Sequence, residues 1–330
     1  MERFALAAAV VLGFALTAAL CSLFVPLRRV LERREQQQPV QSEPPRPAPL
    51  RAPLWGGLCA AAGTVAAVGV GWLAACVGQP ELLGSEGRLM TRLLTALAGS
   101  LAFGVVGLAE DLARMRSPAA LGLRRDVRLL LEALAAAFVL LLLRAAGCLP
   151  RGLGVPGAGY VLLGSAVPFL WAVLMVALAE CARIAERDEG AVCGAAFVAM
   201  LALMMVEAGL GVSGLAVLPG ALAGALVALG LWAFPPARLG VGCCGSLLAA
   251  GAIGCIPLSL DMTSLTVPLA LPFWAAGGLL PAQLLCAKRT GKPLRCWVKK
   301  HKMSPETVFL CSFALSAVGY ILALALLRWC

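Results

Sequence analysis

The sequence contains few charged residues. Only 13% of its 330 residues are charged, whereas hydrophobic residues make up 61%. A soluble domain carries roughly 25% charged residues, so this composition excludes an ordinary soluble globular protein. The mean hydropathy of +0.91 predicts a protein that crosses the membrane several times.

Histidine is almost absent, and the 13 cysteines lack the spacing of a metal site. His301 is the only histidine. The cysteines lie mostly inside apolar runs, where a free thiol behaves as a small hydrophobic side chain. The adjacent Cys243 and Cys244 could suggest a redox or metal site, but no other pattern supports one. The cysteines therefore indicate neither a zinc site nor a disulfide framework.

Long apolar runs divide the chain into predicted membrane helices. About 20 mostly apolar residues cross the hydrocarbon core of a bilayer. We therefore expect one all-α, polytopic membrane domain over residues 1–330 with about ten spans. The predicted spans lie near residues 4–26, 55–78, 89–108, 127–147, 158–179, 190–210, 215–232, 244–260, 264–286 and 306–327.

Basic residues concentrate in loops that ten spans would place on one face. Most of the 27 Lys and Arg residues lie in or beside the first, third, fifth, seventh and ninth predicted loops. By the positive-inside rule this face is cytoplasmic, which predicts a multi-pass plasma-membrane protein with a cytoplasm-facing polar cleft. A proline-rich loop at about 28–54 and a basic loop at about 287–305 lie on this face. Because the bases are scattered, the net charge of +10 indicates orientation and attraction to anionic lipid, with no nucleic acid as partner.

Acidic side chains gather at the breaks between spans. Glu110 and Asp111 end the third apolar run, and Glu180 to Gly190 is the densest charged segment. Arg128 and Glu132 are four residues apart, a spacing that fits either a local ion pair or a role at a site. Topology can place these polar stretches on one side of the membrane, so the chain reads as loops built around one site.

Several short motifs follow one another in an order that indicates a known family. They begin with Trp55-Gly56-Gly57, the stretch Gly107 to Leu112, and Gly122-Leu123 followed by Arg128 and Glu132. These motifs resemble those of the phospho-N-acetylmuramoyl-pentapeptide transferase family, within the polyprenyl-phosphate phospho-sugar transferases of the glycosyltransferase 4 superfamily. In that family they read Thr-Pro-Thr-Met-Gly-Gly, Gly-Phe-x-Asp-Asp-Tyr/Leu and Gly-Leu-x-x-x-x-Lys-x-x-x-Gln.

The matches retain spacing better than residue identity. Within these motifs, Asp111 is retained, whereas Asp, Lys and Gln of the family become Glu110, Arg128 and Glu132. In the family motif Asn-Ala-x-Asn-x-x-Asp-Gly-x-Asp-Gly, the Asn, Asn, Asp, Gly and Asp positions carry Glu180, Arg183, Glu186, Arg187 and Glu189. A further family Asp, part of the family's catalytic set, is replaced by Cys243. The family's His-His-His stretch has no counterpart beyond Lys292 and His301.

The resemblance implies a reaction, a cofactor and partners. Members transfer phospho-N-acetylmuramoyl-pentapeptide or phospho-N-acetylhexosamine from a UDP-sugar to polyprenyl phosphate, releasing UMP, in cell-wall or envelope glycan synthesis. Carboxylates hold Mg²⁺ against the diphosphate. The implied catalytic residues are Glu110, Asp111, Glu186 and Glu189, with Glu186 and Asp111 as metal ligands if Mg²⁺ binds. The spacing of the family's motifs also implies that these four acids and Cys243 converge in one cytoplasm-facing cleft. The implied substrate-binding residues are Arg128, Glu180, Arg183, Arg187, Lys292 and His301. Membrane lipid is a further expected partner, and the sequence leaves open whether the chain forms a homodimer.

The altered site leaves three interpretations. A thiol at Cys243 is a poor ligand for a hard cation, and Arg183 and Arg187 add positive charge where the family binds metal. The chain is therefore either a working transferase with an unusual site or a catalytically silent relative that binds lipid phosphate, a nucleotide-sugar or a membrane partner. The substitutions favour the silent relative, in which we predict that Arg183 and Arg187 pair with the acids in place of Mg²⁺. An unrelated transporter would show broken helices and inverted repeats, which the sequence does not display.

Overall fold

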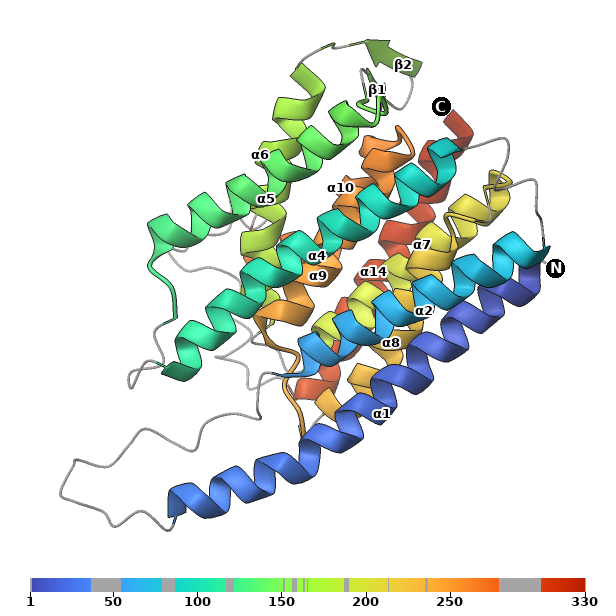
Figure 1. The fold of residues 1–330 in the computed structure, drawn as a ribbon. Coiled ribbons are helices and arrows are strands. Elements are labelled where there is room, and N and C mark those ends of the chain that lie inside the picture. Colours follow the sequence, from blue (N-terminus) through green and yellow to red (C-terminus); the bar gives the residue numbers. More distant parts are fainter. Residues whose placement is uncertain are drawn as a thin grey trace.

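The protein is a bundle of mostly long helices (Figure 1). The computed structural model describes residues 2–36, 55–78, 87–116, 122–150, 152–155, 159–162, 164, 166–186, 190–212, 214–234, 237–278 and 304–329. The first half contains α1 (Glu2–Gln36), α2 (Gly56–Gly78), α4 (Gly87–Arg116), α5 (Arg125–Ala145), β1 (Gly152–Val155), β2 (Gly159–Leu162) and α6 (Ala166–Ala185). The second half contains α7 (Ala191–Gly209), α8 (Val217–Ala233), α9 (Gly242–Ser259), η1 (Thr263–Leu265), α10 (Thr266–Leu269), α11 (Leu271–Gly277) and α14 (Pro305–Trp329). The predicted all-α membrane class is confirmed.

Seven of the described helices are long and apolar enough to cross a membrane, so the predicted number of ten is not confirmed. They are Ala5–Val25, Gly56–Val77, Leu89–Arg116, Ala166–Ala185, Ala191–Gly209, Gly242–Ser259 and Glu306–Leu327. Helix α8 is apolar but shorter. Helix α5 forms as expected, yet Arg128 and Glu132 interrupt its apolar run. The predicted span at 264–286 begins instead as the short helices η1, α10 and α11, and its remainder lies outside the described residues.

Two predicted boundaries were wrong. Residues 159–162, placed in a membrane helix by the sequence, form strand β2, which pairs antiparallel with β1. Glycine at 152, 154, 157 and 159, with proline at 156, favours a hairpin over a helix start. Residues 28–36, assigned to the proline-rich loop, continue helix α1 to Gln36. The rest of that loop and nearly all of the basic loop at 287–305 lie outside the described residues.

Helix α9 is the centre of the bundle. It is buried along its whole length and packs against α4, α6, α2 and α7. Small residues make this possible, because a Cβ atom on Gly251 would lie 3.0 Å from the Phe103 side chain and 3.1 Å from the backbone of Ser100. Close approach through small residues is typical of membrane helices. The pairing of α4 with α9 sets the carboxyl end of α4 beside the amino end of α9.

Candidate functional site

Charged side chains from α4, α5 and the end of α6 meet the Cys243 thiol at the start of α9. We name this group the arginine–carboxylate cluster. It consists of Glu110, Asp111, Arg114, Arg128, Glu132, Glu180, Arg183, Glu186 and Cys243. The convergence of Glu110, Asp111, Glu186 and Cys243 is therefore as predicted, although they span more than 130 residues of sequence. Glu189 and Arg187 lie outside the described residues.

Arg114 lies between the carboxylates. Its Nη2 donates to Glu110 Oε1 at 2.8 Å, and its Nη1 donates to Glu186 Oε2 at 3.2 Å. The same Nη1 lies 4.0 Å from Asp111 Oδ1. The Cys243 thiol donates to Glu186 Oε2 from the other side, at 3.4 Å. One guanidinium therefore neutralises part of three acids, with hydrogen-bond directions fixed by its planar geometry.

A second ion-pair group joins α5 to α6. Arg128 Nε donates to Glu180 Oε1 at 2.7 Å, and Arg183 Nη2 donates to Glu180 Oε2 at 2.7 Å. Arg128 also lies 3.8 Å from Glu110, which connects this group to the carboxylates around Arg114. Arg128 therefore pairs across helices, and the alternative of a local pair with Glu132 was wrong.

Glu132 and two neighbours leave polar atoms without partners. Glu132 is 0% exposed, and neither of its carboxylate oxygens has a hydrogen-bond partner among the described residues. Glu110 Oε2 and Arg183 Nε are buried and unpartnered in the same way. Buried polar atoms nearly always have partners in native proteins. These atoms therefore mark where a water molecule or a ligand would complete the hydrogen bonding.

Asp111 has a structural task that the sequence did not indicate. Its Oδ1 accepts the backbone N–H of Cys243 at 3.0 Å, and its Oδ2 accepts that of Cys244 at 2.9 Å. These are among the first N–H groups of α9, which have no partner within their own helix. A carboxylate there also interacts favourably with the positive end of the helix dipole. Asp111 of α4 therefore caps α9, and both of its oxygens are engaged.

The glycines of the motifs explain how the cluster is held together. A Cβ atom on Gly107 would collide with the backbone of Cys243 and Cys244. A Cβ atom on Gly57 would collide with the backbone of Gly245. Gly56 N–H donates to the carbonyl of Gly240 at 3.2 Å. The glycines of α2 and α4 thus allow both helices to contact the start of α9 directly, backbone against backbone.

The prediction that Arg183 pairs with the clustered acids in place of Mg²⁺ was wrong in one respect. Arg183 pairs with Glu180, whereas the cation between Glu110, Asp111 and Glu186 is Arg114. The signal for Arg114 was present in the sequence, because it follows Glu110 by four residues and Asp111 by three on one helix. Lys292 and His301, predicted to bind substrate, lie outside the described residues.

Comparison with known proteins identifies the family. The model of glycosyl transferase family 4 matches residues 93–261, just over half of the chain and the part that contains the cluster. This chain belongs to glycosyl transferase family 4. It is 25% identical over 308 residues to a phospho-N-acetylmuramoyl-pentapeptide-transferase of Geobacillus kaustophilus (strain HTA426), covering 92% of the chain and 89% of that relative. A protein of the same name from Desulforudis audaxviator (strain MP104C) is 32% identical over 170 residues, 48% of the chain and 50% of that relative.

The described residues do not fit the Mg²⁺ ion that the resemblance implies. Magnesium requires close to octahedral oxygen ligands at about 2.0–2.1 Å. Here the guanidinium of Arg114 lies between the acids, both oxygens of Asp111 accept backbone N–H groups, and Cys243 presents a thiol. The described part of the chain contains no group of three or more acidic, cysteine or histidine side chains arranged to hold a metal.

Proposed function

We propose that this chain is a catalytically silent member of glycosyl transferase family 4 that binds polyprenyl phosphate without transferring a phospho-sugar to it. The observation that carries the proposal is the position of Arg114 between Glu110 and Glu186. In that arrangement the Arg114 guanidinium neutralises part of the negative charge of these acids from within the protein. They are therefore unavailable to hold a metal against a nucleotide diphosphate.

Phosphoryl transfer depends on positioning and on neutralising the charge of the phosphates. The described cluster contains more carboxylates than guanidiniums, and each of its arginines already bonds to a carboxylate. A diphosphate entering the cluster without a metal would meet net negative charge. The loss of transfer therefore follows from the cluster's own charge balance.

Lipid phosphate is the ligand for which the rest of the chain is best suited. The chain carries a net charge of +10, and a basic segment runs from Lys288 to Lys302. A single phosphate at the membrane surface needs fewer cations than a diphosphate, and clustered lysine and arginine attract anionic lipid. The basic residues of the loops support a cytoplasmic position for the cluster by the positive-inside rule.

A working transferase with an unusual site is the second candidate. It is favoured by the carboxylates that remain at Glu110, Asp111 and Glu186, which the resemblance aligns with the family's acids. In this case Arg114 would have to leave the cluster when substrates bind.

The test is an assay for UMP release by the purified full-length chain. UDP-N-acetylglucosamine or UDP-N-acetylmuramoyl-pentapeptide is supplied with undecaprenyl phosphate and Mg²⁺, and the Geobacillus kaustophilus relative serves as positive control. We expect no UMP above the protein-free reaction. Release of UMP that depends on Mg²⁺ would establish the second candidate instead.

Binding is measured separately by thermal unfolding in detergent. Undecaprenyl phosphate should raise the unfolding temperature. A ligand that binds only the folded state, at a concentration of about 100 times its Kd, raises the free energy of unfolding by about 2.7 kcal/mol. Undecaprenol, which has the same chain and no phosphate, is the matched control and should have a much smaller effect. An equal effect of both lipids, or none, would overturn the binding role.

A further inference from the structure

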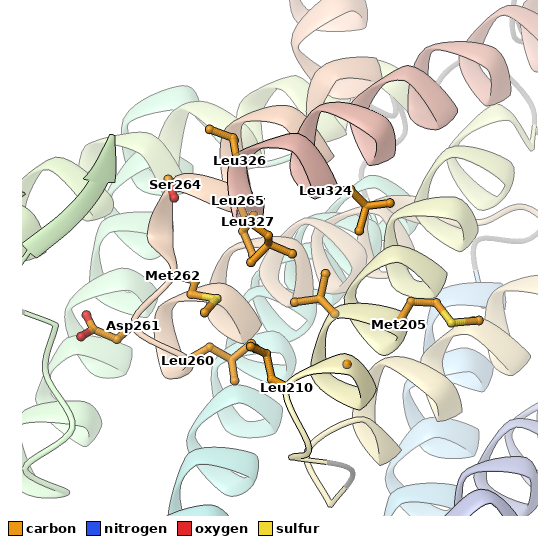
Figure 2. A pocket seen from close by; sticks show the side chains of 12 residues that line it. Met205, Leu210, Leu260, Asp261, Met262, Ser264, Leu265, Leu324, Leu326 and Leu327 are labelled. Carbon is orange, nitrogen blue, oxygen red and sulfur yellow. The ribbon is translucent and has the colours of Figure 1, made fainter. Parts of the chain in front are cut away.

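A cavity of about 620 Å³ lies at the opposite end of the bundle from the cluster. Figure 2 shows it between the carboxyl ends of α7, α9 and α14, with Asp261 and Ser264 near one side and Met205 and Leu324 near the other. Nine of its twelve lining residues are leucine, methionine or valine, and the others are Gly209, Asp261 and Ser264. Its volume lies within the range of about 300–1,000 Å³ that is usual for small-molecule sites.

The cavity opens on the surface that faces the bilayer. Met205 is 55% exposed, Leu210 47% and Leu324 38%. Met205 lies in the candidate span Ala191–Gly209 and Leu324 in the span Glu306–Leu327. In a bilayer these side chains contact hydrocarbon, so the opening is accessible to lipid chains.

The position of the cavity along the bundle places it in one leaflet of the bilayer. Helix α9 runs from Cys243 of the cluster to Ser259 beside the cavity, and its 18 residues correspond to roughly 27 Å. This length is close to the hydrocarbon thickness of about 30 Å. The polar groups of Asp261 and Ser264 therefore lie near the headgroups of the leaflet opposite the cluster. Asp261 follows the end of α9 with a left-handed backbone, at a φ of 63°, a conformation that aspartate tolerates better than most residues.

We propose that this cavity holds one acyl chain of a diacyl phospholipid from the leaflet opposite the cluster. The hydrocarbon lining matches the chain, and the polar groups near the cavity lie at the level of its headgroup. A polyprenyl phosphate is a poorer match, because its phosphate would have to lie at the cluster end of the bundle. The cavity is also concave and lined by helices of one chain, a shape better suited to a flexible chain than to the surface of a second copy.

Gly209 provides a direct way to fill the cavity. It lines the cavity, and a Cβ atom added there would meet nothing within 4 Å. The substitution Gly209→Phe therefore places a ring in or beside the empty space. Gly69 of α2 is the matched control, since it is exposed, lies within the span Gly56–Val77 and also has open space at its Cβ.

The experiment uses native mass spectrometry of the full chain purified in mild detergent. We expect one phospholipid per chain to be retained by the parent and by Gly69→Phe, and to be lost from Gly209→Phe. If Gly209→Phe does not fold, Met205→Trp at the opening replaces it. A diazirine-labelled phosphatidylcholine should also crosslink to peptides that contain Met205 or Leu324.

Three outcomes would overturn the proposal. Equal phospholipid retention in the parent, Gly209→Phe and Gly69→Phe would locate the lipid elsewhere. Displacement of the labelled phospholipid by undecaprenyl phosphate would make the cavity a polyprenyl site. Crosslinks from this surface to a second copy, with no bound lipid, would make it a subunit interface.

Discussion

Removal of Arg114 is the sharpest perturbation of the cluster. The substitution Arg114→Met keeps much of the side chain's length and apolar stem but removes the guanidinium that bonds to Glu110 and Glu186. The carboxylates would then stay buried without their shared cation, since Glu110 is 2% exposed and Asp111 is 0% exposed. We expect a large loss of stability that a divalent cation partly restores.

The size of the expected loss of stability follows from the burial of Arg114 and its carboxylate partners. Removing one partner of a buried ion pair costs about 3–5 kcal/mol. Because 19% of the Arg114 side chain is exposed, water screens it in part, and about 2–3 kcal/mol is the more suitable value. At about 2–4 °C per kcal/mol for a chain somewhat smaller than this one, the unfolding temperature should fall by roughly 5–10 °C.

The assay is thermal unfolding of the purified protein in detergent, followed by tryptophan fluorescence, with either Mg²⁺ or a chelator. The parent should unfold at the same temperature in both. Arg114→Met should gain stability from Mg²⁺, because its acids no longer have an internal cation. Arg116→Met is the matched control, since Arg116 is exposed near the end of the same helix and should change stability by no more than about 0.5 kcal/mol.

Two results would refute this reasoning. If Arg114→Met unfolds at the same temperature as Arg116→Met, the guanidinium does not hold the cluster together. If Mg²⁺ stabilises the parent strongly, the acids bind metal despite Arg114, and the chain is closer to a metal-using transferase.

The remaining predictions concern the start of α9. Gly107→Ala should destabilise the protein by about 1–3 kcal/mol in the same unfolding assay, because its Cβ would collide with the Cys243 backbone. Gly69→Ala has open space and should cost nothing, so equal effects of the two substitutions would contradict the close packing. Asp111→Asn should cost about 0.5–2 kcal/mol, because an amide can accept through only one oxygen. Hydrogen exchange of the Cys243 and Cys244 amides should accelerate, and unchanged exchange there would show that Asp111 is not the cap.

The fold class could be predicted because it depends on composition and on long runs of residues. Apolar stretches of about 20 residues specify membrane helices whatever their neighbours, and the structure confirms α2, α7 and α14 close to their expected ranges, whereas α1 and α4 continue beyond their expected ends. The hairpin of β1 and β2 was missed because glycine-rich apolar residues fit either a strand or the start of a span. Local pattern alone does not separate these two states.

The membership of the cluster was also largely encoded in the sequence. Glu110, Asp111 and Glu186 stand at helix ends, and the spacing of the motifs placed them on one face. The sequence, through its resemblance to the family, thus indicated which acids the site contains and that Glu110, Asp111 and Glu186 meet, but not that Arg114 lies between them.

Only the tertiary structure decided how these charges are paired. Spacing shows that Arg114 and Arg183 can each pair with acids on their own helices, but it does not show which of them reaches the acids of another helix. The choice depends on the packing of α4 and α6 against α9. This packing sets Arg114 beside Glu186, which directly follows α6, and places the Asp111 carboxylate at the first N–H groups of α9. Hydrogen bonds of this kind act over about 3 Å, so they are decided by how helices distant in sequence come into contact.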